Sequence, residues 1–472
     1  MTRDATVARA LAYFDDEAGY FADLARRVAI PTECQEPERL PELYRYLSEA
    51  MGPAFEAMGF ECTVYDNPLD GLGPVLLATR IEDGGLPTVL GYGHGDVIRG
   101  YDAQWRDGLS PWRLTREGDR VYGRGTADNK GQHSVHMGAI AAVLETRGRL
   151  GFNSKFMIET GEENGSKGLK QLVAENTAAF AADAFIASDG PRVDIDHANL
   201  TLGSRGATNF QLRVNLRDGG HHSGNWGGLL ANPGVILAHA LAAIVDRKGR
   251  ILLDAWRPEP ISNSVRAALA PVTRHGGAGA PAIDPDWGEP GLTPAEKVYG
   301  WNTFEVLAFK TGNPENPVNA IPPRAVAHCQ IRYVVGSDED NFLPALRRHL
   351  DERGFAMVEI APPPDGNAAG FLASRTDPDD PWALWAAKAV ARTTGEAPVV
   401  LPNSGGSICN DVFRDVLGVP TVWIPLSYAG CCQHAPDEHI LWPLMRQGME
   451  IIAGLYWDLG DPATGVPKSH QS

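Results

Sequence analysis

The sequence predicts an α/β fold: a discontinuous domain with a mixed, largely parallel sheet, interrupted by an inserted α+β domain. Three observations support this prediction. The 472-residue chain is too long for one ordinary hydrophobic core. Strand and helix patterns alternate over the first 200 residues and again near the C-terminus, which is typical of parallel strands with helical crossovers. The pattern between them differs, so we expect one domain from 1–201 and 371–472 and another from 202–370.

In the first part of the chain, apolar residues at helical spacing before Pro31 predict a helix over 6–28, and a second helix follows over 41–58. Short apolar runs then alternate with longer helical patterns. The predicted strands are Glu61–Tyr65, Val75–Arg80, Thr88–Tyr92, Phe156–Glu159 and Ala184–Ser188, and the predicted helices are Asn129–Thr146 and Lys167–Glu175.

The middle of the chain has the pattern of half-buried antiparallel strands. Apolar residues alternate with polar ones over Thr208–Leu216, and Asn232-Pro233 opens a helix over 233–247. Residues 256–300 are rich in Pro, Gly and Ala and predict an irregular loop. The remaining predicted elements here are strands Thr303–Lys310 and Val326–Val335 and helix Asp338–Arg353.

A Pro-, Gly- and Asp-rich segment, 362–381, is expected to return the chain to the first domain. The α/β pattern then resumes. It predicts helices at 382–394, 408–416 and 438–458, and strands at Pro398–Leu401 and Thr421–Ile424.

The composition describes a folded globular protein, with 43% hydrophobic and 21% charged residues. A net charge of −17 argues against a general nucleic-acid binder. No run of about 18 apolar residues predicts a membrane span, and the N-terminal segment lacks the apolar core of a secretory signal. The six cysteines form no CxxC pair, so we expect reduced thiols in the cytoplasm. Cys431 and Cys432 remain alternative metal ligands because they lie close to His434.

Potential metal ligands follow successive predicted strands. His94 follows the predicted strand Thr88–Tyr92. Asp96 is placed to accept the other ring N–H of this histidine and so to fix its tautomer. Asp128 lies between a Gly-rich turn and a helix N-terminus, where a carboxylate can bridge two cations roughly 3.5–4 Å apart. On their own, an incidental His-x-Asp turn and a helix N-cap are the favoured explanations of these residues, and the metal-ligand interpretation depends on their combination.

An acidic pair, Glu162-Glu163, follows the next strand, and one acid can bind metal while the other serves as a general base. A solvated acidic turn is the alternative. Asp189 ends a further strand, and His434 follows the last one. The carboxyl ends of parallel strands gather ligands at one edge of a sheet. Two histidines with three carboxylates suit Zn²⁺, with Mn²⁺ or Co²⁺ possible.

The chain resembles the M20 family of metallopeptidases, the group of carboxypeptidase G2, aminoacylase and the dipeptidases, over nearly its whole length. The matching segments are Gly-His-Gly-Asp-Val (93–97), Gly-Arg-Gly-Thr-Ala-Asp-Asn-Lys-Gly (123–131), Glu-Glu-Asn-Gly-Ser (162–166), Ser-Asp-Gly (188–190), His-Ser-Gly (222–224), Asn-Ala-Ile-Pro (319–322), Gly-Gly-Ser-Ile (405–408) and His434. The segment after His434, Ala-Pro-Asp-Glu, departs from the commoner Asn-Glu form and leaves the loop geometry open.

This resemblance implies two divalent metal ions, most simply Zn²⁺, bridged by Asp128. His94 and Asp189 would complete one metal site, and Glu163 and His434 the other. It also implies that Glu162 is the catalytic base and that Asp96 orients the first histidine, and that the peptide bond after Asp128 is cis.

The inserted domain resembles the lid and dimerisation domain of the family. There, His222 matches a histidine that polarises the scissile carbonyl in the partner subunit's active site, and His221 is expected to be a bystander. Asn319, Arg332 and Ser407 match positions that hold the substrate carboxylate. A guanidinium suits a carboxylate in its planar fork, and backbone N–H groups near a Gly-Gly-Ser turn favour anions.

We therefore expect a homodimeric, metal-dependent hydrolase that cleaves an amide or peptide bond of a small substrate with a free carboxylate. Asp at position 189 and the segment Ser110-Pro111-Trp112 resemble dipeptidase members. An N-acyl amino acid deacylase and a carboxypeptidase are the alternatives within the family. A catalytically inactive binding protein on a peptidase scaffold is the alternative from another class, but such a protein is expected to have lost ligands that this sequence retains.

Overall fold

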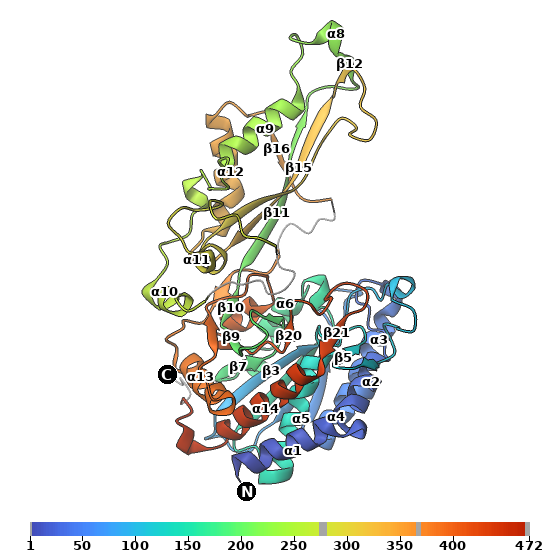
Figure 1. Cartoon of the computed structure of the whole chain (residues 1–472), viewed down its shortest axis with the longest axis vertical. Coiled ribbons are helices and arrows are strands. Elements are labelled where there is room, and N and C mark those ends of the chain that lie inside the picture. Colours follow the sequence, from blue (N-terminus) through green and yellow to red (C-terminus); the bar gives the residue numbers. More distant parts are fainter. Residues whose placement is uncertain (1, 273–280, 365–369, 468–472) are drawn as a thin grey trace.

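Two β-sheets organise the residues that the structure, a computed structural model, describes: 2–272, 281–364 and 370–467. The larger sheet lies in the lower body of Figure 1 with both chain termini, and the smaller one forms an elongated upper body. The larger sheet has eight strands in the order β1-β2-β6-β3-β7-β19-β9-β18. Their bounds are β1 Glu61–Tyr65, β2 Val75–Arg80, β3 Thr88–His94, β6 Asn153–Glu159, β7 Ala184–Ala187, β9 Asn199–Thr201, β18 Val399–Leu401 and β19 Thr421–Trp423.

Parallel pairs form the centre of this sheet. β3 pairs in parallel with β6 and β7, and β19 pairs in parallel with β7. The β1–β2 and β2–β6 pairs are antiparallel, as is the short contact between β19 and β9, whereas β9 and β18 are parallel. The predicted mixed, largely parallel sheet is confirmed.

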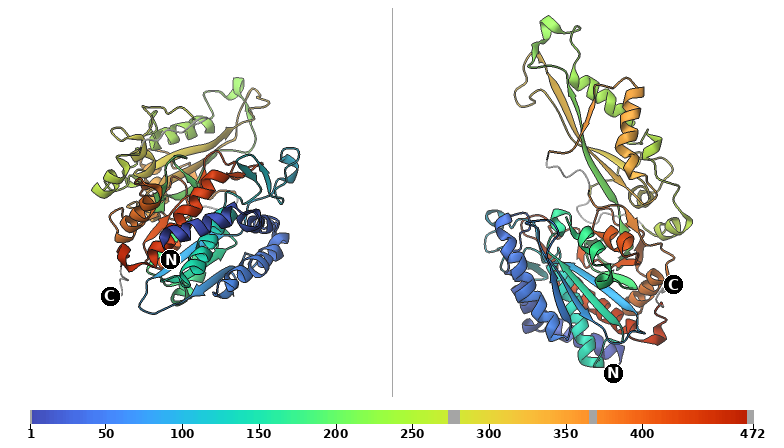
Figure 2. Two further views of the ribbon diagram at one scale, coloured as in Figure 1. Left: turned by 60° about the horizontal axis from the view of Figure 1, so that its bottom comes forward. Right: turned by 180° about the vertical axis from the view of Figure 1, so that it is seen from behind.

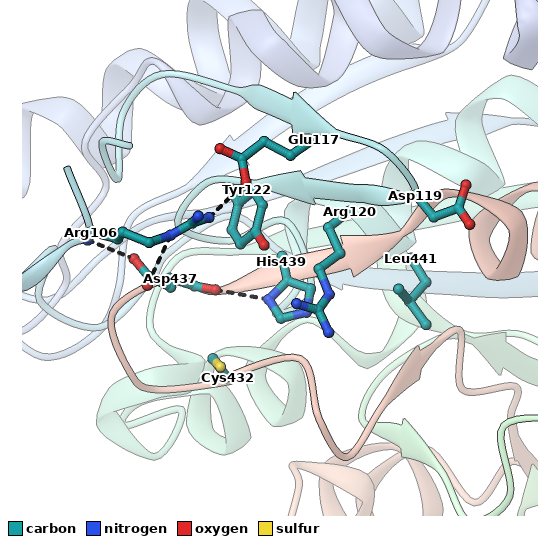
Figure 3. Close-up of a pocket in the computed structure, with 9 residues that line it drawn as sticks. All are labelled: Arg106, Glu117, Asp119, Arg120, Tyr122, Cys432, Asp437, His439 and Leu441. Atoms are coloured by element: carbon teal, nitrogen blue, oxygen red, sulfur yellow. Dashed lines mark hydrogen bonds and ion pairs between the residues drawn. The ribbon is translucent and has the colours of Figure 1, made fainter. Parts of the chain in front are cut away.

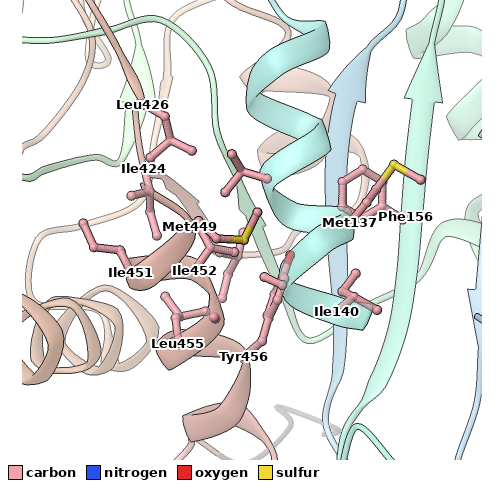
Figure 4. Packing of buried hydrophobic residues seen from close by; sticks show 14 of the residues in the cluster. Met137, Ile140, Phe156, Ile424, Leu426, Met449, Ile451, Ile452, Leu455 and Tyr456 are labelled. Atoms are coloured by element: carbon pink, nitrogen blue, oxygen red, sulfur yellow. The ribbon is translucent and has the colours of Figure 1, made fainter. Parts of the chain in front are cut away.

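Hydrophobic cores lie on both faces of the larger sheet, because successive side chains of a strand point to opposite faces. Leu76 of β2 packs in one core and its neighbour Leu77 in the other. Ile140, Met449 and Tyr456, from two long packed helices, belong to the first core (Figure 4). The helices of this body are α1 Arg3–Asp15, α2 Ala22–Val28, α3 Leu40–Arg45, α4 Gly52–Ala57, α5 Lys130–Arg147, α6 Leu169–Glu175, α7 Thr177–Phe180, α13 Pro381–Thr394 and α14 Trp442–Leu459.

The predicted helix over 6–28 is broken, which corrects the sequence-based expectation. A π-helical segment, Glu17–Phe21, separates α1 from α2, and Gly19 within it has non-helical backbone angles. A Cβ atom at Gly19 would lie 2.1 Å from the carbonyl oxygen of Tyr13, so the close approach of the two backbones requires glycine. The second predicted helix similarly contains a π-helical segment, Tyr46–Met51, between α3 and α4.

The smaller sheet has the order β13-β15-β11-β16 and is antiparallel. Its strands are β11 Gly206–Asn215, β13 Thr303–Thr311, β15 Arg324–Tyr333 and β16 Glu359–Ala361. Helices α9 Pro233–Ile244 and α12 Phe342–Glu352 lie on one side of this sheet in Figure 2, and their apolar residues share a core with its strands. The fold therefore contains the expected α+β unit in addition to the mixed sheet.

Both chain crossings between the two bodies lie side by side. The short strand β10, Gly203–Ser204, enters the upper body and pairs with β17, Ser374–Arg375, which returns from it. The expected boundaries near 202 and 370 remain a prediction. In the described residues, no helix is both long enough and apolar enough to cross a membrane.

Three other expectations need correction. The region 256–300 contains the helices α10 Asn263–Leu269 and α11 Pro294–Tyr299, although 273–280 lies outside the described residues. The helix expected over 408–416 begins at Asn410 and continues as a π-helical segment, Val412–Val416. The final helix starts at Trp442, because the preceding residues form strand β21, His439–Leu441. A short sheet pairs β21 with β5, Arg120–Tyr122, and β5 with β4, Thr115–Glu117.

Candidate active site

The predicted metal ligands converge at the carboxyl ends of the central strands. His94 is the last residue of β3, and Asp189 lies two residues after β7. Glu163 lies in a 3₁₀ turn, Glu162–Asn164, that follows β6. Asp128 lies two residues before the start of α5, and His434 lies in the loop before β21. This convergence follows from the topology, since parallel strands end at one edge of their sheet.

Asp128 faces two different histidines with its two carboxylate oxygens. Its Oδ1 lies 2.8 Å from Nε2 of His94, and its Oδ2 lies 3.0 Å from Nε2 of His434. The same histidine nitrogens lie 3.7 Å from Oδ2 of Asp189 and 2.9 Å from Oε2 of Glu163, respectively. Two groups of three ligand atoms, each within 4.8 Å of one another, therefore share this one carboxylate.

The donor set and its electrostatics fit two divalent cations. Burial raises the pKa of Glu163 to about 7 and that of Asp189 to about 6, and the nearby charge of Asp128 adds to both shifts. Buried carboxylates that repel one another favour their charged form when cations lie between them. Oxygen and imidazole ligands match the preferences of Zn²⁺, Mn²⁺ and Co²⁺. Neither group contains a cysteine, so in the described residues nothing supports Cys431 or Cys432 as a ligand.

Glu162 stands beside these groups without belonging to either. Burial by the surrounding protein raises its pKa well above the usual value for glutamate, and the neighbouring carboxylates Glu163 and Asp189 add to the shift. A carboxyl group with a raised pKa next to a metal centre is typical of a general base or acid. The two adjacent acids of the turn thus differ in that only Glu163 belongs to a ligand group, and their separate roles stay a prediction.

Asp96 contacts His94 differently from the expectation. The backbone carbonyl of Asp96 lies 3.1 Å from Nδ1 of His94, whereas the nearest carboxylate oxygen lies at 3.5 Å. The backbone carbonyl is therefore the main acceptor of the ring N–H, and it leaves Nε2 to face the ligand group. The carboxylate has another contact that the sequence did not reveal, because its Oδ2 accepts a 3.0 Å hydrogen bond from the backbone N–H of Glu163.

Glycines on both sides of His94 permit close packing. A Cβ atom at Gly93 would lie 2.4 Å from the Cβ of His133, and one at Gly95 would lie 2.3 Å from the ring of Tyr46. His133 and Tyr46 are also hydrogen-bonded to each other at 2.8 Å. The Gly-His-Gly sequence therefore reflects the lack of space around the histidine. The peptide bond between Asp128 and Asn129 is cis, as the resemblance implied.

His222 and Asn319 lie together, far from the metal ligands of their own chain. His222 is in the two-residue strand β12, His221–His222, which pairs with β14, Ala320–Ile321. Figure 1 places β12 at the end of the upper body that is remote from β3. His222 is exposed, and its Nδ1 accepts a hydrogen bond from the backbone N–H of Gly224.

Arg332 and Ser407 form a second group, between the two bodies. Nη1 of Arg332 donates to Oγ of Ser407 at 2.8 Å, and that hydroxyl donates to the backbone carbonyl of Arg205 at 2.6 Å. The guanidinium of Arg205 in turn donates to the carbonyl of Gly405. The three residues expected to hold a substrate carboxylate are therefore divided in a single chain, since Asn319 lies at the remote end.

A cavity of about 640 Å³ lies beside the loop that carries His434, but none of the ligands lines it. Arg106 forms ion pairs there with Glu117 and Asp437, which are drawn in Figure 3. The lining residues are Arg106, Glu117, Asp119, Arg120, Tyr122, Cys432, Asp437, His439 and Leu441. The loop thus presents one side to this cavity and His434 to the metal ligands.

Two amide side chains beside the candidate ligands, Gln433 and Asn129, have no sequence signal. The side-chain amide of Gln433 donates a short hydrogen bond to Oδ2 of Asp128. The amide of Asn129 donates to the backbone carbonyl of Ser188 at 2.9 Å, next to Asp189. Amide side chains carry no distinctive spacing, so only the folded arrangement reveals these contacts.

Comparison with known proteins relates this site to a family. The model of peptidase family M20/M25/M40 matches residues 90–458. A Beta-Ala-His dipeptidase of Rattus norvegicus is 26% identical over 422 residues, 83% of this chain and 81% of the relative. A cysteinylglycine-S-conjugate dipeptidase of Corynebacterium striatum is 26% identical over 362 residues, 75% of this chain and 76% of the relative.

Solved structures have the same fold. Human carnosine dipeptidase 1 superposes with a TM-score of 0.75 at 23% identity, covering 97% of this chain and 99% of that one. The dipeptidase Dug1p of Saccharomyces cerevisiae has a TM-score of 0.76 at 20% identity, covering 98% and 99%. The family match spans most of the chain and contains all the predicted metal ligands, and the chain therefore belongs to peptidase family M20/M25/M40.

Proposed function

We propose that this protein is a two-metal dipeptidase that acts on small peptides with a free carboxylate. The observation that carries the proposal is the placement of Asp128, with one oxygen in each of two ligand groups, beside the unshared carboxyl group of Glu162. Dipeptidases among the relatives support this substrate class. All six cysteines are free thiols, which supports a cytoplasmic location.

His94, Asp128 and Asp189 would hold one ion, and Asp128, Glu163 and His434 the other. We propose Zn²⁺ for both, with Mn²⁺ or Co²⁺ as alternatives. Such ions lower the pKa of a bound water and polarise a carbonyl oxygen.

Glu162 is then the general base. Its carboxylate accepts a proton from the attacking water and passes that proton to the nitrogen of the leaving amine. Asp96 positions a residue of each ligand group. Its backbone carbonyl orients His94, and its carboxylate accepts a hydrogen bond from the N–H of Glu163. Loss of the base is therefore expected to affect turnover more than metal content.

Arg332 and Ser407 are proposed to bind the free carboxylate of the substrate. Burial lowers the pKa of Arg332, yet a guanidinium stays protonated at neutral pH. Its Nη1 donates to Ser407 and its Nε to Oε1 of Gln330, and the remaining N–H groups of the fork suit a substrate carboxylate. Because the guanidinium of Arg332 is charged and partly buried, it favours substrates that have an anionic group at that end.

We further propose that the active form is a homodimer in which His222 and Asn319 complete the partner's site. Their position at the remote end of the upper body supports action on another subunit. The edge strand β13 exposes Val306, Leu307 and Phe309, with 61% of Leu307 accessible. Exposed apolar residues on an edge strand are typical of an interface, and a two-fold dimer is the commonest way to cover one.

Reconstitution of the metal-stripped protein tests the central proposal. One and two equivalents of Zn²⁺, Mn²⁺ or Co²⁺ are added, and hydrolysis is followed on dipeptides, N-acyl amino acids and longer peptides. We expect full activity only with two equivalents, and dipeptides as the best substrates. Faster cleavage of N-acyl amino acids would indicate a deacylase, and release of C-terminal residues from longer peptides a carboxypeptidase. Failure to bind metal, together with no hydrolysis of any of these substrates, would support the inactive binding protein.

A further inference from the structure

Two loops that carry metal ligands are joined by one short sheet. The loop with Asp128 follows β5, and the loop with His434 precedes β21, which pairs with β5 in antiparallel register from His439 opposite Tyr122. Glu438 is the last residue before β21, and its backbone carbonyl accepts a 3.0 Å hydrogen bond from the N–H of Gly123. The two loops therefore lie next to each other at the same end of this pair of strands.

The side chain of Glu438 turns back under the loop of Asp128. Its Oε1 accepts hydrogen bonds from the backbone N–H groups of Ala127 at 2.9 Å and Asp128 at 3.1 Å. Its Oε2 accepts from the N–H of Gly125 at 3.1 Å and from Nη1 of Arg124 at 2.7 Å. The side chains of both ion-pair partners are only 1% exposed. All four contacts come from a single turn, 124–128.

This arrangement requires an acceptor-only group. A carboxylate has about four lone-pair positions, which suits the four donors around Glu438. A glutamine at the same place has only one acceptor oxygen, so its NH₂ group would face backbone N–H groups or the guanidinium of Arg124. A buried donor without an acceptor costs about 1–3 kcal/mol, and an unpaired buried charge costs more. The turn 124–128 is therefore stabilised both by the negative charge of Glu438 and by the number of hydrogen bonds that its carboxylate can accept.

We propose that Glu438 is a positioning residue that fixes the bridging carboxylate of Asp128 relative to His434. It belongs to neither ligand group, yet it holds the backbone N–H of Asp128 and lies four residues after His434 in the same loop. The position of Glu438 thus affects both Asp128 and His434. It determines whether each carboxylate oxygen of Asp128 can reach one of the two ion sites. This inference rests on the proposed two-metal function.

Asp458 provides a matched control. Its side chain is 2% exposed and pairs with Arg3 at 3.1 Å and Arg392 at 2.9 Å, near the end of α14. Asp458→Asn, like Glu438→Gln, replaces a buried, ion-paired carboxylate by an amide in the same body. Only Glu438 contacts the ligand turn, so a difference in metal binding between the two variants cannot come from general destabilisation.

The experiment compares wild type, Glu438→Gln and Asp458→Asn as full-length proteins. Thermal unfolding establishes how far each variant is destabilised. Titration of Co²⁺ into the metal-stripped proteins gives affinity and stoichiometry, and the visible absorption of Co²⁺ reports ligand geometry. We expect Glu438→Gln to weaken binding by about 10–100-fold, the usual effect of losing an outer-shell partner. At saturating metal, kcat for a dipeptide should fall more than KM rises.

Asp458→Asn should bind Co²⁺ with the wild-type affinity and spectrum, even if thermal unfolding shows that it is destabilised as much as Glu438→Gln. If Glu438→Gln does not fold, Glu438→Asp replaces it in the comparison. This variant keeps the charge beside Arg124 but withdraws the carboxylate by one methylene, so it should also weaken metal binding.

Wild-type Co²⁺ affinity, spectrum and kcat in the folded Glu438 variant would overturn the inference, as would equal metal losses in both buried-carboxylate variants. The proposed function fails separately, if the wild-type protein itself does not bind two ions or hydrolyse dipeptides.

Discussion

Complementation between two inactive variants tests whether each site is shared by two subunits. His222→Ala removes the proposed carbonyl-polarising group, and Glu162→Gln removes the proposed base. In one chain these residues lie in different bodies, with His222 at the remote end of the upper one. If His222 acts in the partner's site, a mixed dimer has one site with both residues intact and one site that lacks both.

The expected recovery follows from this geometry. Equal amounts of two variants that exchange subunits freely give about half of the dimers as mixed dimers. Each mixed dimer has one intact site of two, so the mixture should regain about one quarter of the wild-type activity. If His222 acts within its own chain, every site in the mixture lacks one of the two groups. Activity would then stay at the average of the two parent variants.

The assay measures dipeptide hydrolysis before and after subunit exchange, which is verified with differently tagged chains. Glu162→Gln mixed with Asp128→Asn is the negative control, because both lesions affect the same subunit's contribution and no mixed dimer has an intact site. His221→Ala should retain wild-type activity, since His221 packs against Trp226 and is not assigned a role. Verified exchange without recovery would refute the shared site.

Three further predictions concern the metal ligands and the interface. Glu162→Gln should keep both ions while kcat falls by about 10²–10⁴-fold, whereas Glu163→Gln should lose metal by elemental analysis; reversed phenotypes would exchange their roles. Asp128→Asn should reduce the stoichiometry at both sites, because one carboxylate serves both ligand groups, and two tightly bound ions in this variant would contradict bridging. Leu307→Glu introduces a charge at an exposed position of the proposed interface. Light scattering should then show folded monomers, which keep a normal metal content but have low activity. An unchanged, fully active dimer would place the interface elsewhere.

The core of the fold and the ligand set were predictable because their signals are local. The strand Thr88–His94 is almost wholly buried, its apolar residues mark it in the sequence, and the predicted ligand His94 lies at its end. The topology of a largely parallel sheet then brings such ends together without further information. For this reason the convergence of Asp128, Glu163 and Asp189 could be expected from the order of strands and motifs, whereas their assignment as metal ligands came from the family resemblance and stays a prediction.

Features that depend on distant contacts were not predictable. The break at Gly19 depends on the nearby carbonyl of Tyr13, while the apolar spacing continues across it. The three-residue strand β21 is too short to show a period and exists through pairing with β5, more than 300 residues earlier. Glu438 has no sequence signal for its role, because its four donors come from a turn that only the fold brings near.

The position of β19 in the large sheet has a consequence for biosynthesis. This strand lies between β7 and β9, but the ribosome makes it some 220 residues after them, once the whole upper body has been translated. A nascent chain that ends before Thr421 therefore exposes an unpaired edge on the apolar strand β7. The upper body, whose strands are contiguous in sequence, can fold first, whereas the N-terminal part must wait for its missing strand. Premature termination near the C-terminus should thus give aggregating fragments instead of a partly active enzyme.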